Sequence, residues 1–218
     1  IDRFIALSES SKNVIEKFGV SSDKISVKYN FIDSSLKKKK TRNKGNYLFI
    51  GRVDKIKGID LLLNTWKELP SNFNLYIIGE GTSSNIAKLY SNNYKNIHFI
   101  GKVHNSHIFE YLRKSSFLVM PSLLLETFGL TIIEAMSIGV PVIGTNIGTR
   151  KEMIKNGING FLFEPNIESL KSCILHSNDI DRQQYNKLSE NAYNFSLKFS
   201  KEIIMKKLIS IYKEVLDE

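Results

Sequence analysis

The stretch Asn46-Tyr47-Leu48-Phe49-Ile50-Gly51 decides the fold that we expect for this chain. Successive side chains of a strand point to opposite faces of a sheet, so this largely apolar run must be buried on both faces. Gly51 ends the run, and residues 59–69 then carry apolar side chains at helical spacing. A short strand that is apolar on both faces and leads into a helix indicates a parallel sheet covered by helices on both sides.

The same alternation continues along the chain in both directions. Further strands are expected over residues 1–7, 25–29, 73–78, 97–100, 117–120, 141–143 and 161–163. Helices are expected over residues 8–18, 59–69, 84–90, 106–113, 130–138, 149–155, 167–176, 182–193 and 201–216. The pattern predicts an α/β fold with a doubly wound, Rossmann-like parallel sheet, whose ligands bind at the carboxyl ends of the strands.

Composition restricts the class of protein. The 218 residues are 42% hydrophobic and 24% charged, which excludes a disordered tail, a collagen-like chain and a coiled coil. A net charge of 31 − 22 = +9 favours anionic partners such as nucleic acid, acidic lipid or phosphorylated metabolites. Cys173 is the single cysteine, which excludes an internal disulfide and fits a reducing, cytoplasmic compartment. Because the sequence starts at Ile1 without Met, we expect a fragment or a processed piece.

A basic stretch suggests how the chain is divided. Residues 37–45 include the run Lys37-Lys38-Lys39-Lys40 and are interpreted as a solvated linker. The alternative for these lysines is contact with anionic lipid, which would place the protein at the inner membrane surface. The linker separates residues 1–36 from a Rossmann-like domain over residues 46–195, and a final helix occupies residues 196–218.

The first candidate site follows the strand at residues 46–50. Its sequence is Gly51-Arg52-Val53-Asp54-Lys55-Ile56-Lys57-Gly58. Gly51 allows the backbone to approach a ligand closely, and Arg52 and Lys57 bracket a turn at the carboxyl edge of the sheet. Two cations at this place would neutralise a diphosphate leaving group. The alternative interpretation is a solvated basic loop.

The second candidate site follows the strand at residues 117–120. Gly129, Leu130 and Thr131 lie where a helix begins, and free N–H groups at such a place bind anions. Glu126 precedes this helix and Glu134 lies inside it, so their carboxylates are candidate acceptors for the hydroxyl groups of a hexose and a ribose. The alternative for Glu134, which lies among apolar residues, is an internal ion pair.

These motifs occur in one order along nearly the whole chain. They are Gly51-Arg52, Lys57-Gly58, Gly79-Glu80-Gly81, Pro121-Ser122, Glu126-Thr127-Phe128-Gly129-Leu130, Glu134-Ala135-Met136, Gly139-Val140-Pro141-Val142-Ile143, Asn156-Gly157 and Asn159-Gly160-Phe161-Leu162. Together they resemble the C-terminal, donor-binding domain of retaining glycosyltransferases with the GT-B fold, the group that includes glycogen and sucrose synthases. The pair of glutamates with Phe-Gly-Leu between them is the most specific part of this resemblance.

The resemblance implies that the donor is a UDP-, GDP- or ADP-linked sugar. Arg52, Lys57 and Glu126 would be catalytic, and the donor-binding residues would be Gly51, Val103, Phe128, Gly129, Leu130, Thr131 and Glu134. It also implies transfer with retention of anomeric configuration and without a metal or other cofactor. The acceptor, a lipid-linked or polysaccharide glycan, would be bound mainly by a missing N-terminal domain. Residues 1–36 would be the end of that domain or the crossover from it, and residues 196–218 would pack on it. The isolated piece would therefore be inactive.

Other features are interpreted as structural. The four histidines and Cys173 show no metal-ligand spacing, Trp66 falls among core leucines, and Asp179 or Asp181 is expected to cap a helix. Two rival functions stay open: a sugar-nucleotide epimerase or phosphorylase of related architecture, and a basic nucleic-acid-binding module. The second is disfavoured because the chain lacks interleaved basic and aromatic residues for stacking bases, so no nucleic-acid partner is expected.

Overall fold

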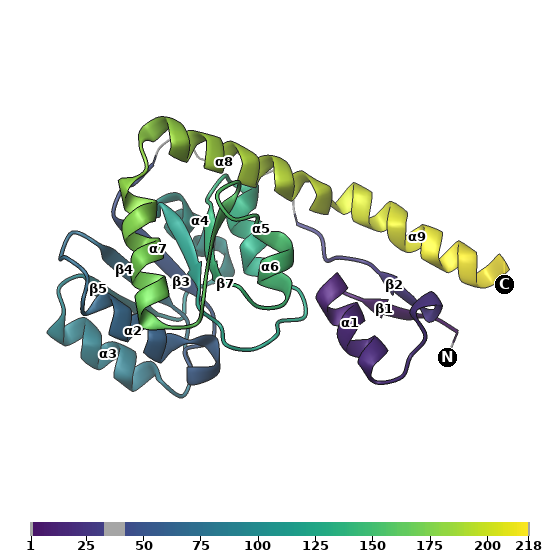
Figure 1. Cartoon of the computed structure of the whole chain (residues 1–218), viewed down its shortest axis with the longest axis horizontal. Helices are drawn as coiled ribbons and strands as arrows, with labels where there is room; N and C mark the ends of the chain where they lie inside the picture. The colour runs from purple at the N-terminus through teal and green to yellow at the C-terminus, as the bar shows by residue number, and fades with distance from the viewer. Residues whose placement is uncertain (1, 33–41, 218) are drawn as a thin grey trace.

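The computed structural model describes residues 2–32 and 42–217 (Figure 1). A six-stranded parallel sheet forms the centre of its larger part. Its strands are β3 (Asn46–Ile50), β4 (Asn74–Ile78), β5 (Ile97–Gly101), β6 (Phe117–Met120), β7 (Val142–Thr145) and β8 (Gly160–Phe163). They lie in the order β5-β4-β3-β6-β7-β8, so the chain extends the sheet in one direction from β3 and in the other from β6. This confirms the predicted doubly wound α/β fold.

Helices cover both faces of this sheet, whereas the first and the last helix of the chain lie beside the small N-terminal sheet (Figure 1). The helices are α1 (Glu9–Lys17), α2 (Ile59–Trp66), α3 (Ser84–Asn93), α4 (Asn105–Arg113), α5 (Leu130–Ser137), α6 (Thr149–Met153), α7 (Ile167–Asp179), α8 (Arg182–Ser196) and α9 (Lys201–Asp217). Residues of α2, α3 and α7 share one buried apolar cluster, and residues of α4 and α5 share a second. The order reverses between β3 and β6, and in such sheets the ligand crevice lies outside the carboxyl ends of the strands at that reversal.

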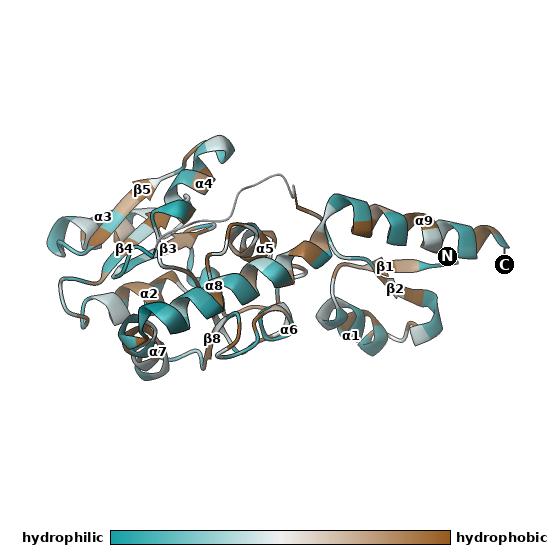
Figure 2. Cartoon of the chain, turned by 90° about the horizontal axis from the view of Figure 1, so that it is seen from above, coloured by the Kyte–Doolittle hydropathy of each residue, from teal (hydrophilic) through white to brown (hydrophobic). Residues whose placement is uncertain are grey.

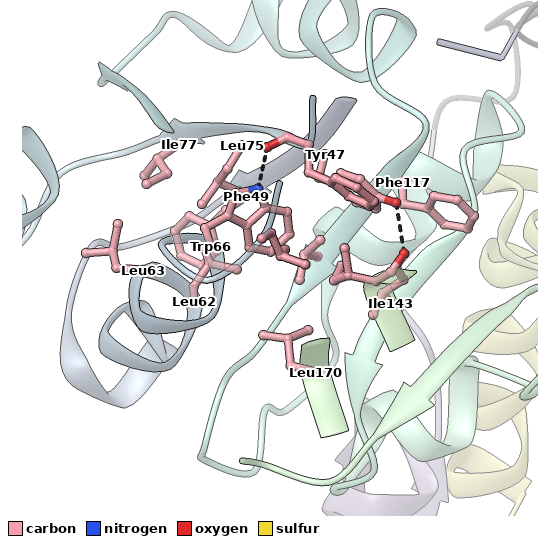
Figure 3. Close-up of a cluster of buried hydrophobic side chains, with 14 of the residues drawn as sticks. Tyr47, Phe49, Leu62, Leu63, Trp66, Leu75, Ile77, Phe117, Ile143 and Leu170 are labelled. Carbon is pink, nitrogen blue, oxygen red and sulfur yellow. Dashed lines mark hydrogen bonds between the residues drawn. The ribbon is translucent and has the colours of Figure 1, made fainter. Parts of the chain in front are cut away.

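The central strand explains why both faces need cover. Tyr47 and Phe49 of β3 belong to the first apolar cluster, whereas Leu48 belongs to the second. Trp66 of α2 lies in the first cluster with no exposed surface, as predicted (Figure 3). Its indole N–H is also satisfied, because Nε1 donates to the carbonyl of Phe73 at 3.1 Å. The core therefore fixes the carboxyl end of β3, from which the first candidate site starts.

The N-terminal residues form a separate small unit. Strands β1 (Phe4–Ala6) and β2 (Ile25–Val27) pair in parallel and are not joined to the larger sheet. Helix α1 packs on them and is tied to α6 by Glu152, whose carboxylate accepts from the backbone N–H groups of Glu9 and Ser10 at 3.3 and 3.2 Å. Tyr29 donates its hydroxyl to the same carboxylate at 2.8 Å. That residues 1–36 belong to a further domain stays a prediction.

The linker expected over residues 37–45 is described only from Arg42 onward, and the lysine run lies outside the described residues. Arg42 is held against the end of α7, because its guanidinium donates to the carbonyls of Ile180, Ser177 and Asn178 at 2.7, 2.8 and 3.1 Å. At this residue the chain is therefore fixed to the Rossmann-like part rather than solvated.

The C-terminal helix extends away from the larger sheet. It follows α8, whose start is capped by Asp181 as predicted, and it runs beside the β1–β2 sheet in both views (Figures 1 and 2). Ile204 and Ile211 of α9 are buried. Other apolar side chains of α9 are exposed, namely Ile203, Ile209, Tyr212 and Leu216. That residues 196–218 pack on a preceding domain stays a prediction.

Candidate functional site

A cavity of about 460 Å³ lies at the carboxyl ends of β3 and β6. This is the point where the strand order of the sheet reverses. Its wall is built from the last residues of these two strands, the segments after them and the start of α5: Phe49, Ile50, Gly51, Arg52, Ile56, Lys57, Met120, Pro121, Ser122, Leu124, Leu125, Glu126, Thr127, Gly129, Leu130 and Thr131. The structure thus brings both motifs of the sequence analysis into one cavity.

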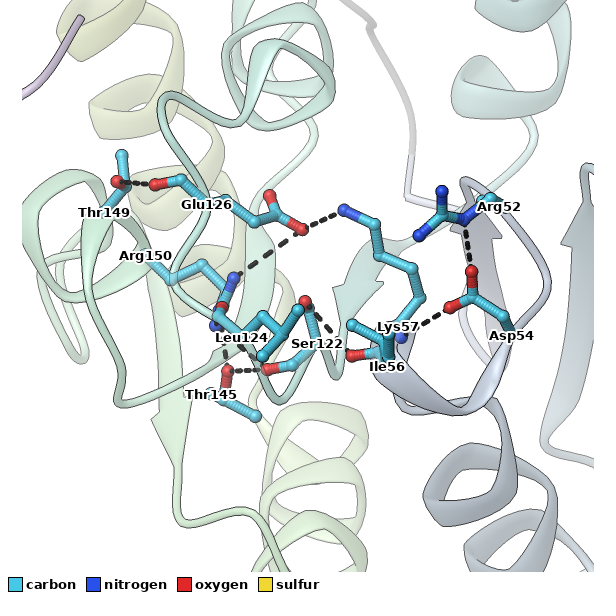
Figure 4. A network of polar contacts seen from close by, with 10 residues as sticks. All are labelled: Arg52, Asp54, Ile56, Lys57, Ser122, Leu124, Glu126, Thr145, Thr149 and Arg150. Atoms are coloured by element: carbon cyan, nitrogen blue, oxygen red, sulfur yellow. Dashed lines mark hydrogen bonds and ion pairs between the residues drawn. The ribbon is translucent and has the colours of Figure 1, made fainter. Parts of the chain in front are cut away.

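The loop after β3 presents two cations to this cavity. Arg52 is mostly exposed and is oriented by Asp54, which accepts from its Nε (Figure 4). Asp54 also begins the 3₁₀ turn Lys55–Lys57, because its carboxylate accepts from the backbone N–H of Lys57 at 2.9 Å. One aspartate therefore orients the Arg52 side chain and fixes the backbone of Lys57.

The two loops pack closely enough to require a glycine. Gly58 has φ +78°, and a Cβ at this position would lie 2.1 Å from the carbonyl oxygen of Pro121. A neighbouring hydrogen bond, from the N–H of Leu123 to the carbonyl of Ile56 at 2.9 Å, also joins the loops. Lys57 thereby comes within reach of the segment after β6.

Glu126 lies between two cations. Its Oε1 is 2.6 Å from Lys57 Nζ and 3.7 Å from Arg150 Nη1, and its side chain is only 11% exposed (Figure 4). Thr149 donates its hydroxyl to the backbone carbonyl of Glu126. Ser8 and Ser11 of the N-terminal unit donate to the carbonyl of Thr127 at 2.8 and 2.9 Å. Two cations therefore hold the carboxylate of Glu126, and side-chain hydroxyl groups fix the backbone of residues 126 and 127.

The start of α5 forms another part of the wall. Gly129 occupies the N-cap position with φ 87°, and no side chain caps the helix. The N–H groups in the first turn of a helix lack partners within it, and the dipole of the helix places partial positive charge there. Gly129, Leu130 and Thr131 all line the cavity. The same end of the cavity also holds the cations Arg52 and Lys57, each of which is paired with a carboxylate.

Comparison with known proteins shows the family of this chain. Residues 31–195 match the family model described as "Glycosyl transferases group 1". The chain belongs to the glycosyl transferases group 1 family. An uncharacterized glycosyltransferase from Methanocaldococcus jannaschii is 33% identical over 229 aligned positions, which cover 99% of this chain and 60% of that protein. This group 1 chain therefore spans about 60% of that relative's length.

Similar solved structures show the fold of this chain. A glycosyltransferase from Rickettsia africae is 27% identical with a TM-score of 0.86, and the match covers 99% of this chain and 64% of that one. Anabaena HepE, solved in complex with UDP and glucose, is 22% identical with a TM-score of 0.86, and the match covers 98% and 63% of the two chains. These neighbours are GT-B glycosyltransferases, which confirms the resemblance and the GT-B fold predicted from the sequence.

Three of the expected donor-binding residues of this group 1 chain do not line the cavity. Phe128 is buried in the second apolar cluster, where its ring packs against those of Tyr29 and Phe199 with centroids 6.0 and 5.9 Å apart. Val103 also packs against that cluster and lines a different hollow, beside α4. The side chains of Phe128 and Val103 therefore pack against the second apolar cluster and do not face this cavity.

Glu134, the third of these residues, lies in the α5 helix that starts at the wall. Its carboxylate has no hydrogen bond or ion pair with any residue in the described ranges. The internal ion pair that the sequence analysis gave as the alternative is therefore not formed among these residues. Burial raises the pKa of Glu134 above its ordinary value of 4.5. The side chain is thus a half-buried acceptor without a protein donor in the part of the chain that is described.

Arg150 was missed by the sequence analysis. It lies in the first turn of α6 with no exposed surface, and one guanidinium nitrogen approaches Glu126. The signal available was a basic residue shortly after β7, at the same edge of the sheet as the other motifs. Nothing in the local sequence around this arginine shows that its side chain is buried.

In residues 2–32 and 42–217, no three His, Cys, Asp or Glu side chains gather as they would around a metal ion. No helix of the described chain has the length and apolar character needed to cross a bilayer.

Proposed function

We propose that this chain supplies the donor-binding half of an enzyme that transfers a sugar from a nucleotide-diphosphate sugar to an acceptor, with retention of anomeric configuration. The observation that carries the proposal is the shared cavity wall of Arg52, Lys57, Glu126 and the uncapped start of α5. The volume of about 460 Å³ falls within the range of roughly 300–1,000 Å³ that is usual for small-molecule sites.

The diphosphate is assigned to the end of the cavity that Arg52, Lys57 and the start of α5 form. An exposed helix N-terminus contributes only about 0.3–1 kcal/mol to anion binding, so the two cations supply most of the attraction. The Nε of Arg52 donates to Asp54, and the other N–H groups of its planar guanidinium are available for phosphate oxygens. The same cations stabilise the charge that develops on the diphosphate as it leaves, which requires no metal ion.

The two glutamates are assigned to hydroxyl groups of the donor. Oε1 of Glu126 faces Lys57 and Arg150, whereas its Oε2 has no hydrogen bond to any described residue. That oxygen is a suitable acceptor for a hydroxyl of the sugar. Glu134 lies outside the wall of this cavity, so it would accept from a ribose that extends beyond the cavity along α5. Donation by the ribose would favour the ionised carboxylate that burial disfavours.

In this scheme the bond between the anomeric carbon and the diphosphate oxygen breaks first, and an oxocarbenium-like sugar forms. The acceptor hydroxyl then attacks from the face that the diphosphate has left and gives its proton to the departing diphosphate oxygen, so the configuration is retained. The acceptor is a lipid-linked or polysaccharide glycan, bound mainly by a domain that precedes this chain in the whole protein.

The crystal structure of HepE with UDP and glucose makes UDP the first nucleotide to test.

A thermal-shift panel of UDP, GDP and ADP, each with its glucose conjugate, tests the proposal. A ligand that binds only the native state stabilises it by about 2.7 kcal/mol at a hundredfold excess over its dissociation constant. We expect one nucleotide series to raise the melting temperature, and the effect to require the diphosphate. The proposal fails if none of the six compounds shifts the transition. Binding of a single-stranded oligonucleotide that weakens steeply with salt would then support the nucleic-acid alternative.

A further inference from the structure

The guanidinium of Arg150 is fixed inside the protein beside the proposed donor site. Arg150 is fully buried, and three of its five N–H donors are used by groups of the two adjoining strand ends. Its Nε donates to the hydroxyl of Thr145 at 2.6 Å, and its Nη2 donates to the carbonyls of Ser122 and Leu124 at 2.9 and 2.8 Å. This charge therefore cannot swing out toward a ligand.

The third nitrogen of the guanidinium is unsatisfied. Arg150 Nη1 is buried and has no hydrogen-bond partner in the described residues, and it lies 3.7 Å from Oε1 of Glu126. A charge-assisted hydrogen bond between such groups spans about 2.7–2.9 Å, so a shift of the Glu126 carboxylate by about 1 Å would complete it. Burial lowers the pKa of Arg150, and the charge of Glu126 raises it in part.

Lys57 is the group that now holds this carboxylate, at 2.6 Å. Under the proposed function, Lys57 must also serve the diphosphate of the donor. When the ammonium turns to the phosphate, Glu126 loses its short contact while its side chain stays almost buried. A buried carboxylate without a partner is strongly destabilising, so this exchange needs a second cation that stays in place.

We propose that Arg150 is a positioning residue that takes over the carboxylate of Glu126 when Lys57 moves to the donor diphosphate. This inference rests on the proposed function. Arg150 acts on the donor only through Glu126 and Lys57, and it keeps the free oxygen of Glu126 directed into the cavity. Its unsatisfied nitrogen is then explained, because its partner arrives only in the donor-bound state.

A double-mutant cycle on UDP affinity tests this role by calorimetry. In the parent chain, Arg150→Met should weaken UDP binding about tenfold, which corresponds to about 1.4 kcal/mol. In the Glu126→Gln background no carboxylate needs a counter-ion, so the same substitution should change affinity less than twofold. Equal losses in both backgrounds, or no loss in the parent, would overturn the inference. Arg182→Met, at an exposed arginine outside the cavity wall, is the matched control.

A second variant covers the case in which Arg150→Met does not fold. Arg150→Lys keeps the charge and loses the fork that bonds Ser122 and Leu124. Its UDP affinity should stay within about threefold of the parent, whereas a loss as large as that of methionine would show that the loop contacts matter and not the charge. Failure of the parent chain to bind any nucleoside diphosphate overturns the proposed function as well. Binding with additive losses overturns this inference alone.

Discussion

Replacing Lys57 by alanine tests the assignment of the diphosphate most sharply. Its ammonium lines the cavity, and the proposed function gives it a charge-assisted hydrogen bond to phosphate. Such a bond contributes about 1.5–3 kcal/mol, which corresponds to roughly 10- to 150-fold in affinity. Part of that binding free energy is offset, because the Lys57 ammonium must give up its 2.6 Å contact with Glu126 when UDP binds. Removing the lysine also takes away one of the two cations beside Glu126, so this carboxylate repels the diphosphate more strongly. We therefore expect Lys57→Ala to weaken UDP binding by at least about tenfold.

The control is Lys55→Ala, which removes the same charge from the same 3₁₀ turn. Lys55 is exposed and does not line the cavity. Calorimetric titration with UDP should therefore give nearly the parent affinity for this variant. Similar losses in the two variants would show that only the general positive field attracts the nucleotide, and the assignment of Lys57 would be wrong. In the whole protein, Lys57→Ala or Arg52→Ala should reduce turnover by orders of magnitude.

Three further predictions concern stability. Gly58→Ala should lower the melting temperature more than Gly157→Ala, because both sites have positive φ but only Gly58 meets a backbone atom, the oxygen of Pro121. Trp66→Ala should destabilise the chain by about 3–5 kcal/mol in urea unfolding, and a loss under 1 kcal/mol would contradict its burial. The raised pKa of Glu134 means that the folded state holds this proton more tightly, so its stabilising effect is complete below pH 4.5 and is lost as pH rises through the folded pKa. Glu134→Gln should remove that decline, and parallel pH profiles of stability for the variant and the parent would show that the pKa of Glu134 is not raised.

The fold was predictable because local patterns and tertiary structure agree. Strands such as β3 and β6 are apolar on both faces, and this property alone requires helices above and below the sheet. The convergence of the two loops was predictable as well, since parallel strands end at one edge. Gly58 illustrates the limit: the sequence shows a glycine that opens a helix, and only the structure shows the approach of Pro121.

The parts that escaped prediction depend on contacts between distant segments. Phe128 turns inward because Tyr29 and Phe199, about a hundred and seventy positions apart, meet at its ring. Arg150 is buried because carbonyls from the loop after β6 point at its position. Arg42 was expected in a solvated linker, yet carbonyls at the end of α7 bind it. No local pattern of charge or hydropathy encodes such partners.

A crystal structure of this chain with the nucleoside diphosphate that binds most tightly in the panel tests the donor site most directly. We expect the phosphates to lie at the start of α5, within hydrogen-bond distance of the Lys57 ammonium. We also expect Glu126 to have moved toward Arg150. A diphosphate bound away from the Lys57 and Gly129 wall would contradict the donor site, and with it the proposed function.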